Sequence, residues 1–476
     1  MELPFFTIAI CVLLFIGLII GFVKGVKRGF YSLVSNIISI VAAFGITRII
    51  IIVLSKRGLT PIGDKILGNP IFHDITDVEA LNYTPKFIAT VCLSLVLFYA
   101  FYIVFLIITQ IVKRKIFNKV TKVSYSKYNV LLEKKWYMKI LAILIGFVSC
   151  ATTCYVLTFG IVAVNDAILK GFEESDKIST PYVCKKIKDN YAYNVISKCK
   201  AKEVFDGLTK MHDSNVNTTT TNEITKGIKT VVALDNVANN NEVEKNLDIL
   251  GDCITTTDIV PEIAAQIVID RANEVKVEEP KKNEKGMDAR FARLKNELLI
   301  FAKSSNKDNI KENTKTAVNI GKKVFEKDLE KISTYKEVMD TLKDESFVED
   351  IFVELYNNKN TQNIMGYLID LCVGSVFDSI NVDIKETYIF SLDYSKLSLS
   401  EVKKEANIIS LFAKDYEIIQ KLSKAEMLAE EEMKQIKEDL KNIEKCEIIT
   451  TTVYDTINGY IKNLELVETP TLPVTE

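Results

Sequence analysis

Apolar and polar positions are segregated along this chain of 476 residues, because nearly every long apolar run lies before Val164. Four runs reach about 20 residues, the length that a helix needs to cross a hydrocarbon core about 30 Å thick. They are Phe5–Val23, Phe30–Leu54, Phe87–Val112 and Ile140–Val164. None contains an acidic residue, and Arg48 is the one charge in their interiors. The pattern predicts four membrane-spanning helices.

Glycine recurs at every fourth position near the end of the first run, at Gly17, Gly21, Gly25 and Gly29. On a helix this spacing leaves one face without side chains, so that another helix can approach closely in lipid. We favour packing within the chain, and contact with a second copy in a homo-oligomer is the alternative. The short segment Lys24–Gly29, with three cations, predicts a tight basic corner between the first two helices.

The second run carries a polar face. Ser32, Ser35, Asn36 and Ser39 follow the spacing i, i+3, i+4, i+7, which gathers them on one side of a helix. Lipid offers them no hydrogen-bond partner, so this face must meet protein or water. We favour interhelical hydrogen bonds, because no acid or lysine within the apolar runs marks an ion or proton route. A polar pathway is the alternative.

The connections between the runs predict an orientation. The corner is basic, and the third connection, Lys113–Lys139, is rich in Lys and has Glu133 as its one acid. Loops of this kind stay in the cytoplasm. The second connection, Ser55–Lys86, mixes acids with bases and suits the outer side. Four spans then place both termini and the whole C-terminal block outside.

The apolar block resembles the colicin V production protein family of bacterial inner-membrane proteins. The resemblance is carried by a glycine-spaced first span that runs into a basic corner followed at once by a second span. The matching residues are Gly17, Gly21, Gly25, Lys27, Arg28, Gly29 and Phe30. It covers residues 5–164 and implies a multi-pass plasma-membrane protein linked to toxin production or export and to the state of the envelope. It implies no catalytic residues, and the long C-terminal block is a departure from typical members.

From about Asp166 the sequence is polar and helical in period, which predicts a large α-helical domain outside the membrane. We expect one lobe over residues 166–275, a charged linker over 276–288, a second lobe over 289–466 and a flexible tail over 467–476. The expected helices are Val183–Lys200, Asn222–Asn239, Glu242–Thr255, Ile259–Val275, Ala289–Ser304, Ala317–Ile332, Thr361–Phe377, Leu399–Leu422, Lys424–Asn442 and Val453–Leu464. The predicted fold is all-α, with a four-helix transmembrane domain over residues 1–165.

Composition and motifs narrow the function further. A content of 48% hydrophobic and 26% charged residues fits a membrane block joined to a polar block, and the net charge of −2 says little about partners. Outside the short loops beside the apolar runs, no block has the basic and aromatic character of a nucleic-acid surface, so we expect no nucleic-acid partner. We find no phosphate-binding loop, catalytic motif or metal-ligand spacing, so we expect no enzyme, cofactor or metal. The favoured function is an envelope scaffold whose partners are the lipid bilayer and proteins outside it. An oligomeric channel or transporter subunit is the alternative.

Overall fold

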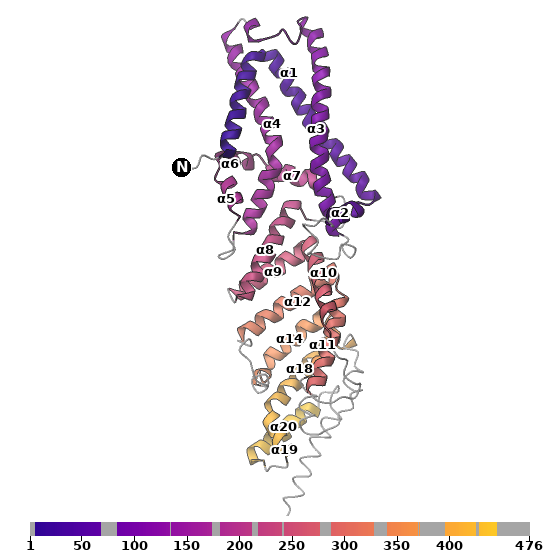
Figure 1. The fold of residues 1–476 in the computed structure, drawn as a ribbon. Helices are drawn as coiled ribbons and strands as arrows, with labels where there is room; N and C mark the ends of the chain where they lie inside the picture. The colour runs from indigo at the N-terminus through magenta and orange to yellow at the C-terminus, as the bar shows by residue number, and fades with distance from the viewer. Residues whose placement is uncertain are drawn as a thin grey trace, which may run out of the picture. The chain divides into compact units, whose positions relative to one another are not determined.

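A computed structural model describes residues 5–67, 83–133, 135–173, 181–211, 218–239, 242–276, 287–327, 340–369, 371, 396–424 and 428–444. Within these ranges every regular element is a helix, as the periodicity predicts. The chain divides into two compact units (Figure 1). Unit 1 comprises Met1–Asn241 with Asp252–Ile263, and unit 2 comprises Glu242–Gly251 with Ala264–Glu476.

Three helices of unit 1 are long and apolar enough to cross a membrane. They are α1 (Phe5–Arg57), α3 (Tyr83–Thr121) and α4 (Trp136–Gly171). Helix α1 is bent at Gly25, whose φ of 71° and ψ of 167° are not helical. Glycine adopts a positive φ without a steric penalty. The bend gives α1 two limbs, residues 5–24 and 26–57, which fold back on each other in Figure 1. At 1.5 Å per residue they measure about 30 and about 48 Å.

The limbs of α1 pack against α3 and α4, and this bundle has two distinct ends. At the corner end lie Gly25 and the segment between α3 and α4, which includes the short 3₁₀ helix η2 (Val130–Leu132). At the opposite end α1 and α3 begin, α4 finishes, and the small helix α2 (Thr60–Leu67) packs on α3. We call this the capped end, because side chains of polar helices bond there to the first turns of α1 and α3.

The polar helices of unit 1 gather at the capped end. They are α5 (Tyr182–Lys188), α6 (Tyr191–Lys198), α7 (Ala201–Thr209), α8 (Thr220–Ala238) and the parts of α9 (Val243–Thr256) and α10 (Ile259–Glu274) that belong to this unit. A continuous helix over 183–200 is wrong, because the chain breaks at Asp189 and restarts with Asn190 as the N-cap of α6. Asparagine favours such caps over helix interiors.

Unit 2 contains α11 (Met287–Lys303), α12 (Lys307–Glu326), α14 (Glu345–Asn357), α15 (Gln362–Ile369), α18 (Leu399–Lys414), α19 (Tyr416–Ser423) and α20 (Glu430–Glu444). Helix α12 begins ten residues before the expected Ala317, because the Asn306 side chain caps it by accepting from the N–H groups of Asp308 and Asn309. The helix expected over 399–422 breaks at Asp415. The helix expected over 453–464, the tail and most of the linker lie outside the described residues.

The core of unit 2 is built mainly on α14 and α18, where Phe352, Ile409 and Phe412 are buried. Two carboxyl groups lie close to it. Asp415, between α18 and α19, is 5% exposed and Asp439 of α20 is 6% exposed. Burial raises the pKa of Asp415 to about 7, and the neighbouring Asp439 adds to the rise through repulsion and a hydrogen bond. A carboxyl group in such surroundings keeps its proton at pH values well above its ordinary pKa.

Candidate functional site

The polar face of the second α1 limb meets polar side chains of α3 and α4. Ser39 shares a hydrogen bond with Thr109 of α3 (2.9 Å between the hydroxyl oxygens), and its hydroxyl also donates to the Ser35 carbonyl (2.7 Å). At the end nearest the corner, Lys113 Nζ donates to Ser32 Oγ (3.4 Å). Ser35 and Ser39 are buried. All four polar positions thus lie along the interior of the bundle.

Asn36 is at the centre of this face and bonds to both neighbouring helices. Its Nδ2 donates to Thr153 Oγ1 (3.1 Å) and to the Ser149 carbonyl (3.4 Å), both on α4. Its Oδ1 accepts from the Tyr102 hydroxyl of α3 (2.7 Å). Because Asn36 is 5% exposed, these bonds replace the water that its amide loses on burial. The residue therefore joins three segments of the bundle.

Gly17 and Gly21 of the first α1 limb, which we call the glycine ladder, face α4. A Cβ placed on Gly21 would lie 2.4 Å from the Ala142 carbonyl oxygen and 2.8 Å from Gly146 Cα. One on Gly17 would lie 2.4 Å from Cys150 Cβ. Such contacts exclude any side chain and allow the two backbones to touch, as small residues do in membrane helix pairs. In this structure the ladder is occupied by a helix of the same chain.

At the corner end the remaining motif residues meet the loop before α4. The Arg28 guanidinium lies 4.6 Å from the Tyr125 ring centroid and donates to the Tyr128 carbonyl (3.2 Å). Glu133 Oε1 accepts from the Val26 N–H (3.2 Å) and from the Tyr128 hydroxyl. Burial raises the pKa of Tyr128, and the Glu133 carboxylate raises it further, so the phenol stays a donor.

Other motif residues serve different ends. A Cβ on Gly25 would lie 3.1 Å from the Tyr128 ring, and one on Gly29 would lie 3.2 Å from Ile145 Cγ2. Lys27 and Phe30 are exposed. Within the motif, glycines and Arg28 therefore hold the corner together, whereas Lys27 and Phe30 remain on the surface.

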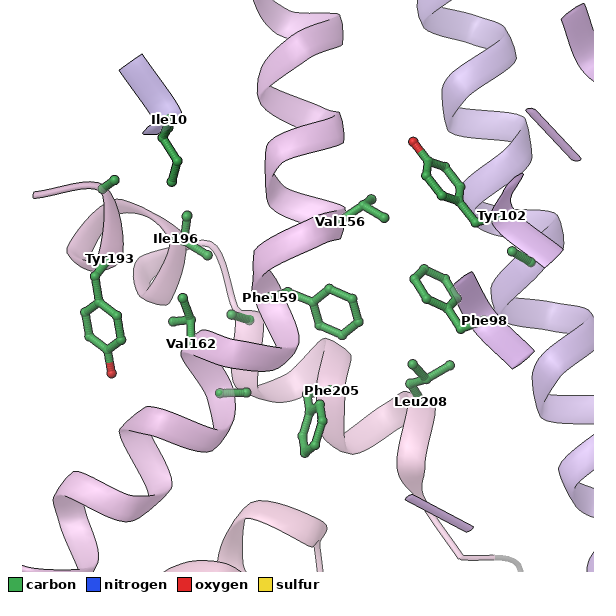
Figure 2. Packing of buried hydrophobic residues seen from close by; sticks show 14 residues of the cluster. Ile10, Phe98, Tyr102, Val156, Phe159, Val162, Tyr193, Ile196, Phe205 and Leu208 are labelled. Carbon is green, nitrogen blue, oxygen red and sulfur yellow. The ribbon is translucent and has the colours of Figure 1, made fainter. Parts of the chain in front are cut away.

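Helix α7 inserts its apolar side among the long helices. Phe205 and Leu208 are fully buried in one cluster with Phe98 of α3 and Phe159 of α4. The Phe98 and Phe159 rings meet edge to face with centroids 5.7 Å apart, and Figure 2 shows Leu208 beside Phe98. Burying four large apolar side chains is strongly favourable, at roughly 1.5–3 kcal/mol each. This apolar layer lies between the polar face and the capped end.

Arg48, the charge within the second apolar run, binds the C-terminus of α7. Its Nη1 donates to the carbonyls of Leu208 (3.2 Å) and Lys210 (2.5 Å). The last carbonyls of a helix lack partners within it and carry partial negative charge. Arg48 therefore meets a helix terminus, and local periodicity does not predict this partner because α7 is distant along the chain.

Side chains from the polar helices also cap the long apolar helices. Asn190 Oδ1 accepts from the Thr7 N–H (3.2 Å) and hydroxyl (3.1 Å) in the first turn of α1. Glu262 of α10 accepts from the Tyr83 N–H (2.6 Å), the Thr84 N–H and the Thr84 hydroxyl (2.6 Å) at the start of α3. The first N–H groups of a helix have no acceptor within it, so these side chains supply the missing acceptors.

The same device continues into the polar helices. Asp206 of α7 accepts from the Thr221 N–H (2.9 Å) and hydroxyl (2.7 Å) at the start of α8. Glu223 of α8 accepts from the N–H groups of Asp258 (2.8 Å) and Ile259 (3.2 Å) at the start of α10. Burial raises the pKa of Glu223, while these hydrogen bonds oppose the rise. Carboxylates at helix N-termini thus link α7, α8, α10 and α3 in series.

A few polar atoms of the bundle stay without a partner. The hydroxyl groups of Ser35, Thr47 and Ser94 are buried and make no hydrogen bond within the described part of the chain. The same part contains no group of three or more His, Cys, Asp or Glu placed to hold a metal. The arrangement suits helix association, because the polar side chains of α1 bond to α3 and α4. No protein-family model, curated protein or solved structure matches the chain.

Proposed function

We propose that the chain is a multi-pass scaffold of the bacterial plasma membrane, of the colicin V production type, linked to toxin production or export or to envelope homeostasis. The two limbs of α1, together with α3 and α4, form four crossings. The basic corner end faces the cytoplasm, and both termini lie outside. The helical part after residue 165 binds protein partners outside the membrane, with no enzymatic step.

One observation favours a scaffold function over a pore function. Asn36 is the most polar residue of the intramembrane face, and its amide is bonded to Tyr102, Thr153 and the Ser149 carbonyl. A group engaged on three sides serves helix association rather than passing ions. The hydrogen bonds that Asn190 and Glu262 accept also connect the long apolar helices to the polar helices. A scaffold requires such a connection between its membrane part and its partner-binding part.

The channel alternative has an observation of its own. The hydroxyls of Ser35, Thr47 and Ser94 have no partner among the described residues, and water inside the bundle would satisfy them. Vesicles containing the purified full-length chain separate the two functions. The scaffold predicts ion flux equal to that of empty vesicles. Flux above that level that is lost in Asn36→Leu, with assembly intact, would replace the scaffold with a channel.

Topology and partners are tested in cells. An epitope added after Glu476 should be cleaved by protease in intact cells if the polar block lies outside, whereas protection until lysis contradicts the orientation. A photo-crosslinking amino acid at Phe291 of α11, which is 56% exposed, should capture discrete proteins. The same amino acid at buried Phe352 is the matched control. If neither Phe291 nor other exposed positions of unit 2 give a product absent from the control, the partner-binding role fails.

A further inference from the structure

An open groove of about 680 Å³ runs between α3 and α4 in unit 1. Leu95 and Tyr99 line it from α3, Leu157 and Gly160 line it from α4, and Phe205 of α7 completes the wall. Its volume falls within the range of about 300–1,000 Å³ that is usual for sites of small ligands. The groove is separate from the polar face, which lies between α1 and the other two helices.

Gly160 has no packing reason to be glycine. A Cβ there would lie 3.8 Å from Leu95 Cδ2 and 3.8 Å from Phe205 Cδ2, which is ordinary contact. At Gly146, in contrast, a Cβ would lie 2.4 Å from Gly21 Cα. Glycine inside a helix costs about 1 kcal/mol relative to alanine. What the missing side chain provides at Gly160 is room in the groove.

The polar atoms on the groove wall are used within the chain. The Tyr99 hydroxyl donates to the Val156 carbonyl (3.2 Å). Asn165 Nδ2 donates to the Cys184 carbonyl (3.3 Å). The wall therefore presents apolar surface to an occupant, which must itself be apolar where it is enclosed, since a buried polar group without a partner is costly.

The position of the groove indicates where that occupant comes from. Its walls belong to the apolar runs of α3 and α4, so at this depth the surrounding medium is hydrocarbon. Leu157 and Ile161 on its rim are 49% and 53% exposed, which leaves the groove open toward lipid. Past Asn165 the helix turns polar, with an ion pair between Asp166 and Lys170 (3.4 Å). A molecule with an apolar tail and a polar head matches this gradient.

We propose that this groove holds one acyl chain of a membrane phospholipid, with the headgroup at the Asn165 end and the second chain left in the bilayer. The site is independent of whether the protein acts as a scaffold or a channel, and it requires only that α3 and α4 span the membrane. Gly160 sets the depth to which the chain enters.

A photoactivatable phospholipid with a diazirine on one acyl chain tests the site in vesicles containing the full-length protein. After illumination, peptide mapping by mass spectrometry should show labelling of groove residues enriched on the order of tenfold over Ile107, an exposed position of α3 outside the groove. A tenfold preference corresponds to about 1.4 kcal/mol. Labelling of the groove no greater than at Ile107 means annular lipid only and overturns the proposal, whatever the variants do.

Variants test the role of Gly160. Gly160→Phe fills the groove and should remove the enrichment while labelling at Ile107 continues, whereas Gly160→Ala, which adds one methyl group, should reduce it only in part. If Gly160→Phe does not assemble, Leu95→Trp fills the same space from α3. Enrichment that persists in an assembled filled variant contradicts the site. A diazirine fatty acid added in parallel identifies the source, because labelling by free fatty acid alone would overturn the assignment to phospholipid.

Discussion

The contact between the glycine ladder and α4 makes a quantitative prediction for Gly146→Ala. The new Cβ would lie 2.4 Å from Gly21 Cα and 2.5 Å from the Gly17 carbonyl oxygen, whereas ordinary contacts begin at 3.4 Å. The two helices must therefore separate by about 1 Å (3.4 − 2.4) at their closest point. Overpacking of this kind costs about 1–3 kcal/mol.

Gly45→Ala is the matched control, because a Cβ on Gly45 meets nothing within 4 Å. Both substitutions exchange glycine for alanine inside a helix, so the gain in helix propensity of up to about 1 kcal/mol cancels between them. We expect Gly146→Ala to unfold with a free energy about 1–3 kcal/mol lower than Gly45→Ala.

The measurement is unfolding of the full-length protein in detergent by increasing amounts of a denaturing detergent, followed by circular dichroism. A thiol-reactive dye gives a second readout, because Cys154 is buried in the folded bundle and becomes accessible when α4 separates. Equal stability of the two alanine variants would show that α1 and α4 do not approach at these glycines, and the account of the ladder would have to be abandoned.

Three further predictions concern charged groups. Arg48→Leu should leave the last carbonyls of α7 without their donor, at about 1.5–3 kcal/mol, and should speed trypsin cleavage within α7; cleavage at the wild-type rate contradicts the cap. Glu262→Gln should accelerate hydrogen exchange at the start of α3, whereas the exposed Glu274→Gln should not. The pKa of Asp415 in the folded protein, about 7, exceeds its ordinary value, so the stability of the fold should decrease as the pH rises from about 4 to about 7. Asp415→Asn should remove this pH dependence and stabilise the protein by up to about 4 kcal/mol at pH 8. Thermal unfolding across this pH range measures both effects.

Much of the membrane block follows from local pattern. The spacing of Gly17 and Gly21 specifies a side-chain-free face, and the spacing of Ser32 through Ser39 specifies a polar one, because a helix repeats every 3.6 residues. The partners of the polar face also follow a helical spacing, since Tyr102, Thr109 and Lys113 lie on one face of α3.

The contacts made by single charged or amide groups were not accessible in the same way. Arg48, Asn190 and Glu262 each bind a helix end that is far away in the sequence. Periodicity reports which face of a helix is apolar, but a terminal N–H or carbonyl leaves no mark on composition. The break before α6 is of the same kind, because the Asn190 side chain bonds to Thr7 of α1 and to the Lys186 carbonyl, and neither contact is visible in the local pattern.

The capping of α1 and α3 has a consequence for the order in which the protein matures. A ribosome makes the chain from its N-terminus, so the long apolar helices are synthesised before Asn190 and Glu262 exist. Until those two residues arrive, the first turns of α1 and α3 carry N–H groups without these acceptors. The starts of α1 and α3 are therefore completed only after the polar helices of unit 1 are synthesised. A segment from the middle of the chain thus completes the two helices that are made before it.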